Sequence, residues 1–114
     1  MPEDRAGGLL GLARRAGRIG AGTNAALQLL RSGRAELVIV ASDAAPRTKG
    51  LFSREAGRYG IRALEWADTR RLGLSIGATP KAVVVLTDRG LAGAFLLAAS
   101  GASGQDLPGG EQRK

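Results

Sequence analysis

The sequence contains no cysteine and no histidine. Without cysteine the chain has no disulfide framework, no thiolate zinc site and no cysteine nucleophile. Without histidine it lacks the commonest general base and the commonest metal ligand. The carboxylates show no paired spacing typical of acid–base catalysis, because Glu55, Glu65 and Asp68 fall on different predicted elements. We therefore expect a protein that is not an enzyme and that uses no metal and no cofactor.

Aromatic residues and long apolar runs are also scarce. Only 4% of the residues are aromatic, so the core must be built from Leu, Val, Ile and Ala packed closely. No apolar run approaches the length that spans a bilayer. The first residues are polar, and the apolar stretch 9–12 is too short for the core of a secretory signal. We expect a cytoplasmic protein with no membrane contact.

Positive charge, in contrast, is abundant. The 114 residues carry a net charge of +7, and 14 of the 17 basic residues are Arg. A sequence pI of about 11.3 is typical of domains that bind nucleic acid, because basic chains displace counterions from polyanions. A solubility role, or the coding bias of a G·C-rich genome, is the alternative explanation of the charge.

Hydrophobic periodicity predicts strands that alternate with helices. The run 37–41 is continuous and β-branched, as in a strand buried on both faces. Pro46 suits the first position of a helix that Gly60 ends, and Asp68 and Asp88 are good helix caps. Alternation of this kind predicts an α/β fold with helices on both faces of the sheet. The predicted helices are 4–16, 25–32, 46–59, 69–76 and 88–100, and the predicted extended segments are 18–21, 37–41, 61–65 and 81–86.

The chain divides into one domain and a tail. Residues 1–100 carry all the predicted elements and show no internal repeat. From residue 101 the composition changes to Gly, Ser, Asp, Pro and Gln, which predicts a flexible, disordered tail over 101–114.

The segment Gly20 to Ala25 is the most informative one for function. Glycines before a helix allow a ligand to approach the backbone, and the free N–H groups there favour a phosphate. The segment also satisfies the dinucleotide fingerprint G-x-G-x-x-A, although only Ile19 stands where that fingerprint requires a strong strand. The structural alternative is a tight turn into the helix with Thr23 as its cap. Asn24 adds an amide that can both donate and accept, as the reading of a purine edge requires.

Four segments together resemble the ribosomal L-seven-Ae/L-thirty-e type of kink-turn RNA-binding proteins, in particular its small bacterial YlxQ-like branch. They cover roughly residues 7 to 100 in the right order and spacing. The resemblance implies a three-layer αβα sandwich around a small mixed sheet. The four segments are Gly8 to Gly17 (GLLGLARRAG), Gly22 to Asn24 (GTN), Ala35 to Ala44 (AELVIVASDA), and Leu72 to Gly77 (LGLSIG) with Val83 to Gly90 (VVVLTDRG).

The resemblance also implies which residues contact RNA. Gly22, Thr23 and Asn24 would face the sheared G·A pairs of a kink-turn, and a second surface would lie beside a splayed-out base. The family usually has Glu after the Asn and Lys three residues later, where this chain has Ala25 and Gln28. Each loss costs about 1–3 kcal/mol of discrimination, so the RNA is bound more weakly or is a different element. The second surface corresponds to the loop Ala78, Thr79, Pro80 and Lys81.

Basic residues near these segments complete the expected site. Arg14 and Arg18 precede the glycine turn, and Arg47 and Lys49 open the next helix, so we expect phosphate contacts from them. The alternative for each is an ordinary solvated side chain on a helix surface.

Three functional hypotheses remain open from the sequence. The first is a monomeric, non-catalytic binder of structured RNA, such as ribosomal RNA, associated with ribosomes. The second is a nucleotide- or phosphate-binding enzyme that uses the Gly20–Ala25 turn. The third is a protein-interaction module, which the scarcity of aromatic anchors disfavours.

Overall fold

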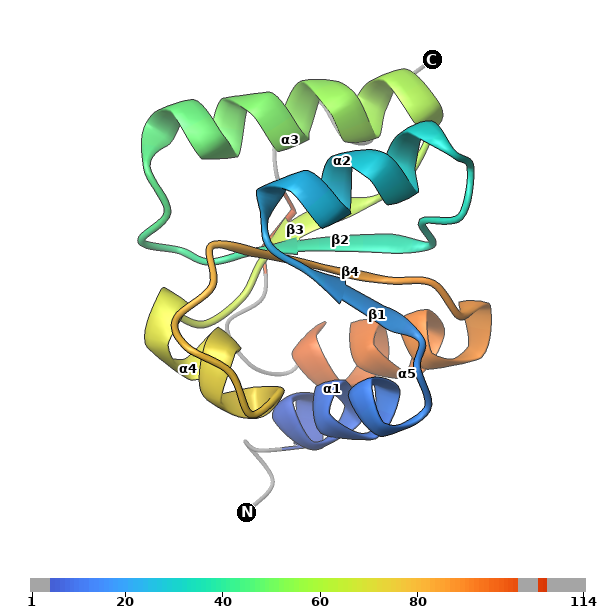
Figure 1. Ribbon diagram of the computed structural model, residues 1–114, viewed down its shortest axis with the longest axis vertical. Coiled ribbons are helices and arrows are strands. Elements are labelled where there is room, and N and C mark those ends of the chain that lie inside the picture. Colours follow the sequence, from blue (N-terminus) through green and yellow to red (C-terminus); the bar gives the residue numbers. More distant parts are fainter. Residues whose placement is uncertain (1–4, 101–104, 107–114) are drawn as a thin grey trace.

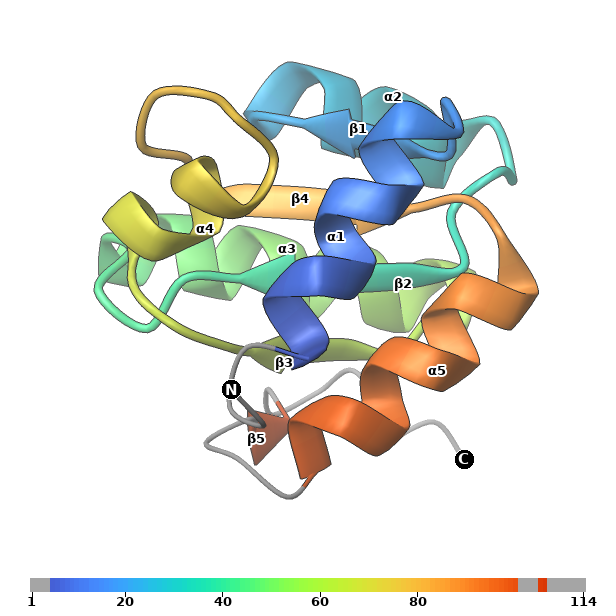
Figure 2. The same ribbon diagram turned by 90° about the horizontal axis from the view of Figure 1, so that it is seen from below.

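The computed structural model describes residues 5–100 and 105–106, and they form three layers. A mixed sheet lies in the middle, with α2 and α3 on one face and α1, α4 and α5 on the other (Figures 1 and 2). This confirms the expected αβα sandwich. The helices are α1 (Arg5–Arg15), α2 (Thr23–Arg31), α3 (Pro46–Tyr59), α4 (Thr69–Ser75) and α5 (Arg89–Ser100); the strands are β1 (Ile19–Ala21), β2 (Leu37–Val40), β3 (Ala63–Glu65), β4 (Val83–Leu86) and β5 (Gln105–Asp106).

The sheet has the strand order β1-β4-β2-β3-β5. β2 and β3 pair in parallel, whereas β1 with β4, β2 with β4, and β3 with β5 pair antiparallel. Every residue of the two central strands, β2 and β4, is buried, because helices cover both of their faces. The strand order places β1 at one edge of the sheet, beside β4.

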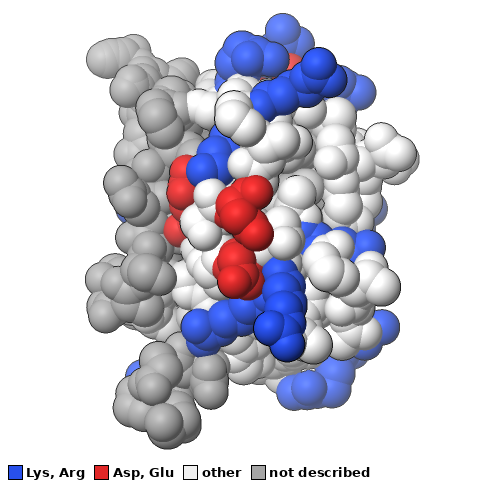
Figure 3. Space-filling view, turned by 90° about the vertical axis from the view of Figure 1, so that its left-hand side faces the viewer, with Lys and Arg blue, Asp and Glu red and all other residues white. Residues whose placement is uncertain are grey.

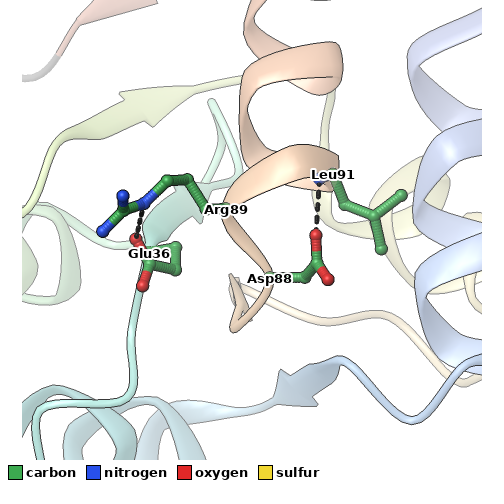
Figure 4. A network of polar contacts seen from close by, with 4 residues as sticks. All are labelled: Glu36, Asp88, Arg89 and Leu91. Carbon is green, nitrogen blue, oxygen red and sulfur yellow. Dashed lines mark hydrogen bonds and ion pairs between the residues drawn. The ribbon is translucent and has the colours of Figure 1, made fainter.

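Local signals set most of the element ends. α3 begins at Pro46 and stops where Gly60 adopts the left-handed conformation at φ 70°, and both bounds were predicted. At the start of α5 the carboxylate of Asp88 accepts from the N–H of Leu91 at 2.9 Å. The next residue, Arg89, lies 3.9 Å from Glu36, before β2, so this end of α5 is tied to the neighbouring strand (Figure 4).

The core is apolar, and among the described residues it contains no buried polar or charged side chain. Its three bulkiest members are Trp66, Phe52 and Phe95, and the rings of Trp66 and Phe95 pack edge to face with centroids 5.4 Å apart. The guanidinium of Arg71 lies over the Trp66 ring, 5.0 Å from its centroid. Trp66 thus belongs to the core, and Arg71 covers it.

The observed elements differ from the predictions mainly at their ends. The strand expected over 61–65 begins at Ala63, and the one expected over 81–86 begins at Val83. The hydrogen bonds of the sheet nevertheless extend further, since the N–H of Val38 donates to Arg62 O and that of Ala41 to Ala82 O. The sequence pattern therefore located the extended chain, while the paired part is shorter.

Most of the tail expected over 101–114 lies outside the described residues. Gln105–Asp106 are described, and they form β5 rather than part of a structureless tail. They pair with Leu64 and Glu65 of β3. The edge of β3 offers unpaired backbone groups, which is the physical reason that a polar segment can add a strand there.

Candidate functional site

Three connecting segments meet at one end of the sheet: the turn from β1 to α2, the segment from β2 to α3, and the loop from α4 to β4. The N–H of Gly22 donates to Val83 O at 2.9 Å, and the N–H of Ala41 donates to Ala82 O at 2.9 Å. This end is at the left of Figure 1 and faces the viewer in Figure 3. The fold thus brings the glycine turn close to the end of the loop 78–81.

The glycine turn leaves the N-terminus of α2 without a side-chain cap. Gly22 is the N-cap residue, and its φ of 95° is a conformation that residues with a Cβ rarely adopt. Thr23 is the first helical residue, so the structural alternative is wrong in placing the cap at Thr23: the cap position falls one residue earlier, at Gly22. Thr23 and Asn24 are both exposed. The first N–H groups of α2 are accordingly available to an anion.

The N-termini of α3 and α4 differ in whether a side chain accepts from their first N–H groups. α3 follows Ala45 with no side-chain cap and no acidic residue in its first turn. At α4, in contrast, Asp68 accepts from Arg71 N and Asp43 accepts from Thr69 N, each at 2.8 Å. In Figure 3, Asp and Glu gather in the middle of this end of the molecule, with Lys and Arg around them. An anion therefore finds favourable ends at α2 and α3, and negative charge at α4.

The loop 78–81 is held in place by close packing. A Cβ at Gly73 would lie 2.7 Å from the carbonyl carbon of Thr79 and 2.9 Å from Pro80 Cα, so only glycine fits there. The N–H of Ala78 donates to Gly73 O at 2.8 Å, and the N–H of Lys81 donates to Thr69 O at 3.1 Å. Thr79 and Pro80 are exposed, whereas Ala78 and Lys81 are half-buried. The loop thus presents two side chains on a fixed backbone.

The four basic residues expected at the site lie in different places. A guanidinium nitrogen of Arg14 lies 3.4 Å from the point that a Cβ on Gly77 would occupy, at the start of the loop, and Arg47 is exposed in the first turn of α3. Lys49 forms an ion pair with Glu65 at 3.3 Å, on the β3 side of α3. The carbonyl of Arg18 accepts from Thr87 N at 2.9 Å, past the far end of β4. The structure therefore brings Arg14 and Arg47 to this end of the sheet, but not Arg18.

The outer face of α2 continues the site. Asn24, Leu27, Gln28, Arg31 and Ser32 line an open depression of about 350 Å³. Arg31 is exposed, and sequence reasoning missed it. Its position seven residues after Asn24 and three after Gln28 was the available signal, because that spacing places all three on one helix face. Asn24 and Gln28 therefore belong to one continuous surface that ends at a cation.

The sheet topology disfavours the dinucleotide hypothesis. The dinucleotide fingerprint requires a parallel strand immediately before the glycine turn. Here β1 has three residues and pairs antiparallel with β4 at the edge of the sheet. Within residues 5–100 and 105–106, no three His, Cys, Asp or Glu side chains are placed to hold a metal ion. No helix of that part is both long and apolar enough to cross a bilayer.

Comparisons with known proteins agree with this geometry. Residues 4–94 match the model of the family described as Ribosomal protein L7Ae/L30e/S12e/Gadd45. The RNA-binding protein YlxQ of Bacillus subtilis (strain 168) is 33% identical over 84 residues, which are 74% of this chain and 84% of that protein.

Two solved structures share the fold. One is a protein with unknown function from Bacillus halodurans C, with a TM-score of 0.81 and 28% identity over 84% of this chain and 97% of that one. The other is the 15.5kD RNA binding protein of Giardia lamblia, with a TM-score of 0.71 and 22% identity over 83% of this chain and 82% of that one.

Proposed function

Since this chain belongs to the ribosomal protein L7Ae/L30e/S12e/Gadd45 family, we propose that it binds structured RNA of the kink-turn type without catalysing a reaction. The RNA would lie across the N-terminus of α2 and the loop 78–81. The relative from Bacillus subtilis is named as an RNA-binding protein, which supports RNA as the partner. The ribosomal proteins in the family name support association with ribosomes, and we propose that the chain acts there as a cytoplasmic monomer.

One observation carries this proposal: the uncapped start of α2 lies next to a loop that packing holds rigid. Gly22 opens the helix without a side-chain acceptor, and Gly73 fixes the position of Thr79 and Pro80. A folded RNA with a kink presents phosphates and unpaired base edges within a short distance of each other. A preformed pair of surfaces can bind both at little cost in ordering entropy.

The exposed side chains suggest how recognition would be divided. Asn24 has the amide donor and acceptor that base edges require. Arg14 and Arg47 lie on either side and would contact phosphates, which adds affinity without sequence information. Thr79 and Pro80 offer a small, partly apolar surface for a base that has left the stack. Ala25 and Gln28 supply neither the carboxylate nor the cation usual at those positions, so we expect moderate affinity.

The test is a binding titration with a short kink-turn RNA and a matched unkinked duplex, each at two salt concentrations. The parent protein should prefer the kinked RNA. Asn24→Ala should reduce that preference by about tenfold, the equivalent of 1.4 kcal/mol, because it removes base-edge contacts. Arg14→Ala should weaken both RNAs alike and reduce the slope of log K against log salt by about 0.9, as one phosphate contact predicts.

Arg5→Ala is the matched control, since it removes one exposed charge from the other end of α1. It should leave the preference and the salt slope close to those of the parent. Equal affinity of the parent for kinked and unkinked RNA would contradict kink-turn recognition. Binding of neither RNA would contradict RNA binding altogether.

A further inference from the structure

A row of arginines runs along the outer surface of α3. Arg47, Arg54 and Arg58 are all exposed. Their spacing of seven and four residues places them on one helix face, over a length of about 16 Å. That face is the opposite one from buried Phe52 and Ala56. A guanidinium nitrogen of Arg54 lies 3.5 Å from the point that a Cβ on Gly50 would occupy, so this side chain lies back along the helix toward Arg47.

The row faces outward from the sheet, on the solvent side of α3. Lys49, whose ion pair with Glu65 marks the β3 side of α3, is nine residues before Arg58 and hence on the opposite side of the helix. α2 and α3 are in contact and run in the same direction (Figure 1). Arg31, at the end of the depression on the outer face of α2, therefore lies on the same layer. We call Arg31, Arg54 and Arg58, which lie in the C-terminal halves of α2 and α3, the distal arginine row. It does not include Arg47, which lies at the N-terminus of α3.

Negative charge is nearly absent from this layer. α2 has no acidic residue, and α3 has only Glu55. Glu55 is half-buried, and its Oε1 is shielded from solvent without a hydrogen-bond partner among the described residues. Within the described residues, no ion pair involves a member of the distal arginine row. Arg54 and Arg58 are four residues apart, where like charges weaken a helix, and a bound polyanion would remove that repulsion.

We propose that the distal arginine row binds the phosphate backbone of the RNA helix that leaves the kink site, along α2 and α3. This inference rests on the proposed function, because Arg47 and Asn24 place the kink site at the N-termini of the same two helices. The continuity of charge from Arg47 to Arg58 is the reason to choose RNA over a protein partner. A protein interface would also require aromatic anchors, and Tyr59 is the only large apolar residue of these helices that is well exposed within the described chain.

The test compares two kinked RNAs, one with a short stem and one whose stem is about ten base pairs longer, and adds a plain duplex. Arg54→Gln combined with Arg58→Gln should weaken binding of the long-stem RNA and of the duplex. The slope of log K against log salt for the long-stem RNA should fall by about 2, as two lost phosphate contacts predict. Binding of the short-stem RNA should change little, since its backbone ends before the row.

Arg5→Gln combined with Arg89→Gln is the matched control, because it removes two exposed charges from the other helical layer. It should leave all three affinities unchanged. An unchanged slope in the Arg54/Arg58 variant would overturn the proposal, as would an equal fall in the control. If the variant loses a protein partner while its RNA binding is intact, the row is a protein interface and the proposal is also overturned.

The experiment separates this proposal from the proposed function. If the parent binds the plain duplex and the kinked RNAs alike, and the variant still loses slope, the distal row is supported and kink recognition fails. If the parent prefers kinked RNA but binds the long-stem and short-stem RNAs with equal affinity, kink recognition is supported and the distal row fails. Absence of RNA binding by the parent would overturn both.

Discussion

Thr69 donates two hydrogen bonds to the carboxylate of Asp43, which lies 26 residues earlier in the chain. The N–H of Thr69 lies 2.8 Å from Oδ1, and its hydroxyl lies 3.2 Å from Oδ2. Nearby, the N–H of Ser42 donates to Ala67 O at 2.7 Å. The segment between β2 and α3 is therefore tied to the start of α4, and the same start supports the loop 78–81 through Thr69 O and Lys81 N.

Removing the carboxylate of Asp43 should loosen this connection. We expect Asp43→Ala to lower the free energy of unfolding by about 1 kcal/mol, as for the loss of a helix cap. Thr69→Val removes the hydroxyl contact and leaves the backbone one, so its effect should be about half as large. Urea denaturation followed by circular dichroism measures both. Equal effects of Thr69→Val and Asp43→Ala would show that the backbone hydrogen bond contributes little.

The close packing of Gly73 against Thr79 should affect both the free energy of unfolding and the affinity for kinked RNA. Gly73→Ala places a methyl group against the backbone of Thr79 and Pro80, so the loop must move. We expect a loss of about 1–3 kcal/mol in the free energy of unfolding, together with weaker binding of kinked RNA by the folded protein. Gly93→Ala is the control: it lies in α5 with open space around the added methyl group, and it should be neutral or stabilising. Unchanged RNA affinity in folded Gly73→Ala would remove the loop from the interface.

Gln28 offers a test by gain of function. Gln28→Lys adds a cation between Asn24 and Arg31 in the depression on α2. Binding of kinked RNA should strengthen by about 1 kcal/mol at low salt, which is roughly fivefold, and the salt slope should steepen by about 0.9. Gly93→Lys adds the same charge on the other helical layer and controls for net charge. The same gain from both variants would mean that position 28 has no special contact with the RNA.

The sequence predicted those features that depend on neighbouring residues. α3 has its predicted bounds because Pro46 and Gly60 act on the backbone next to them. The central strands were found because helices bury both of their faces, which requires continuous apolar runs. The three-layer arrangement followed from the family resemblance, and the fold of the chain confirms it.

The features that were missed depend on how distant segments meet. Arg18 was grouped with the glycine turn because it precedes that turn by four residues. β1 is extended and antiparallel to β4, so those four residues carry the chain from one end of the sheet to the other. In the same way, the contacts of Arg14 with Gly77 and of Gly73 with Thr79 follow from the packing of α1 and α4, which no local pattern specifies. The structural alternative placed the cap of α2 one residue too late, at Thr23, because both Gly and Thr are acceptable caps.

The common direction of α2 and α3 has a kinetic consequence. Their N-termini lie at the same end of the molecule, so the partial positive charges of both helices add there. A negatively charged partner would then be turned by the field before it touches the surface, and a larger share of its collisions would be productive. Added salt should therefore lower the association rate constant more than it raises the dissociation rate constant.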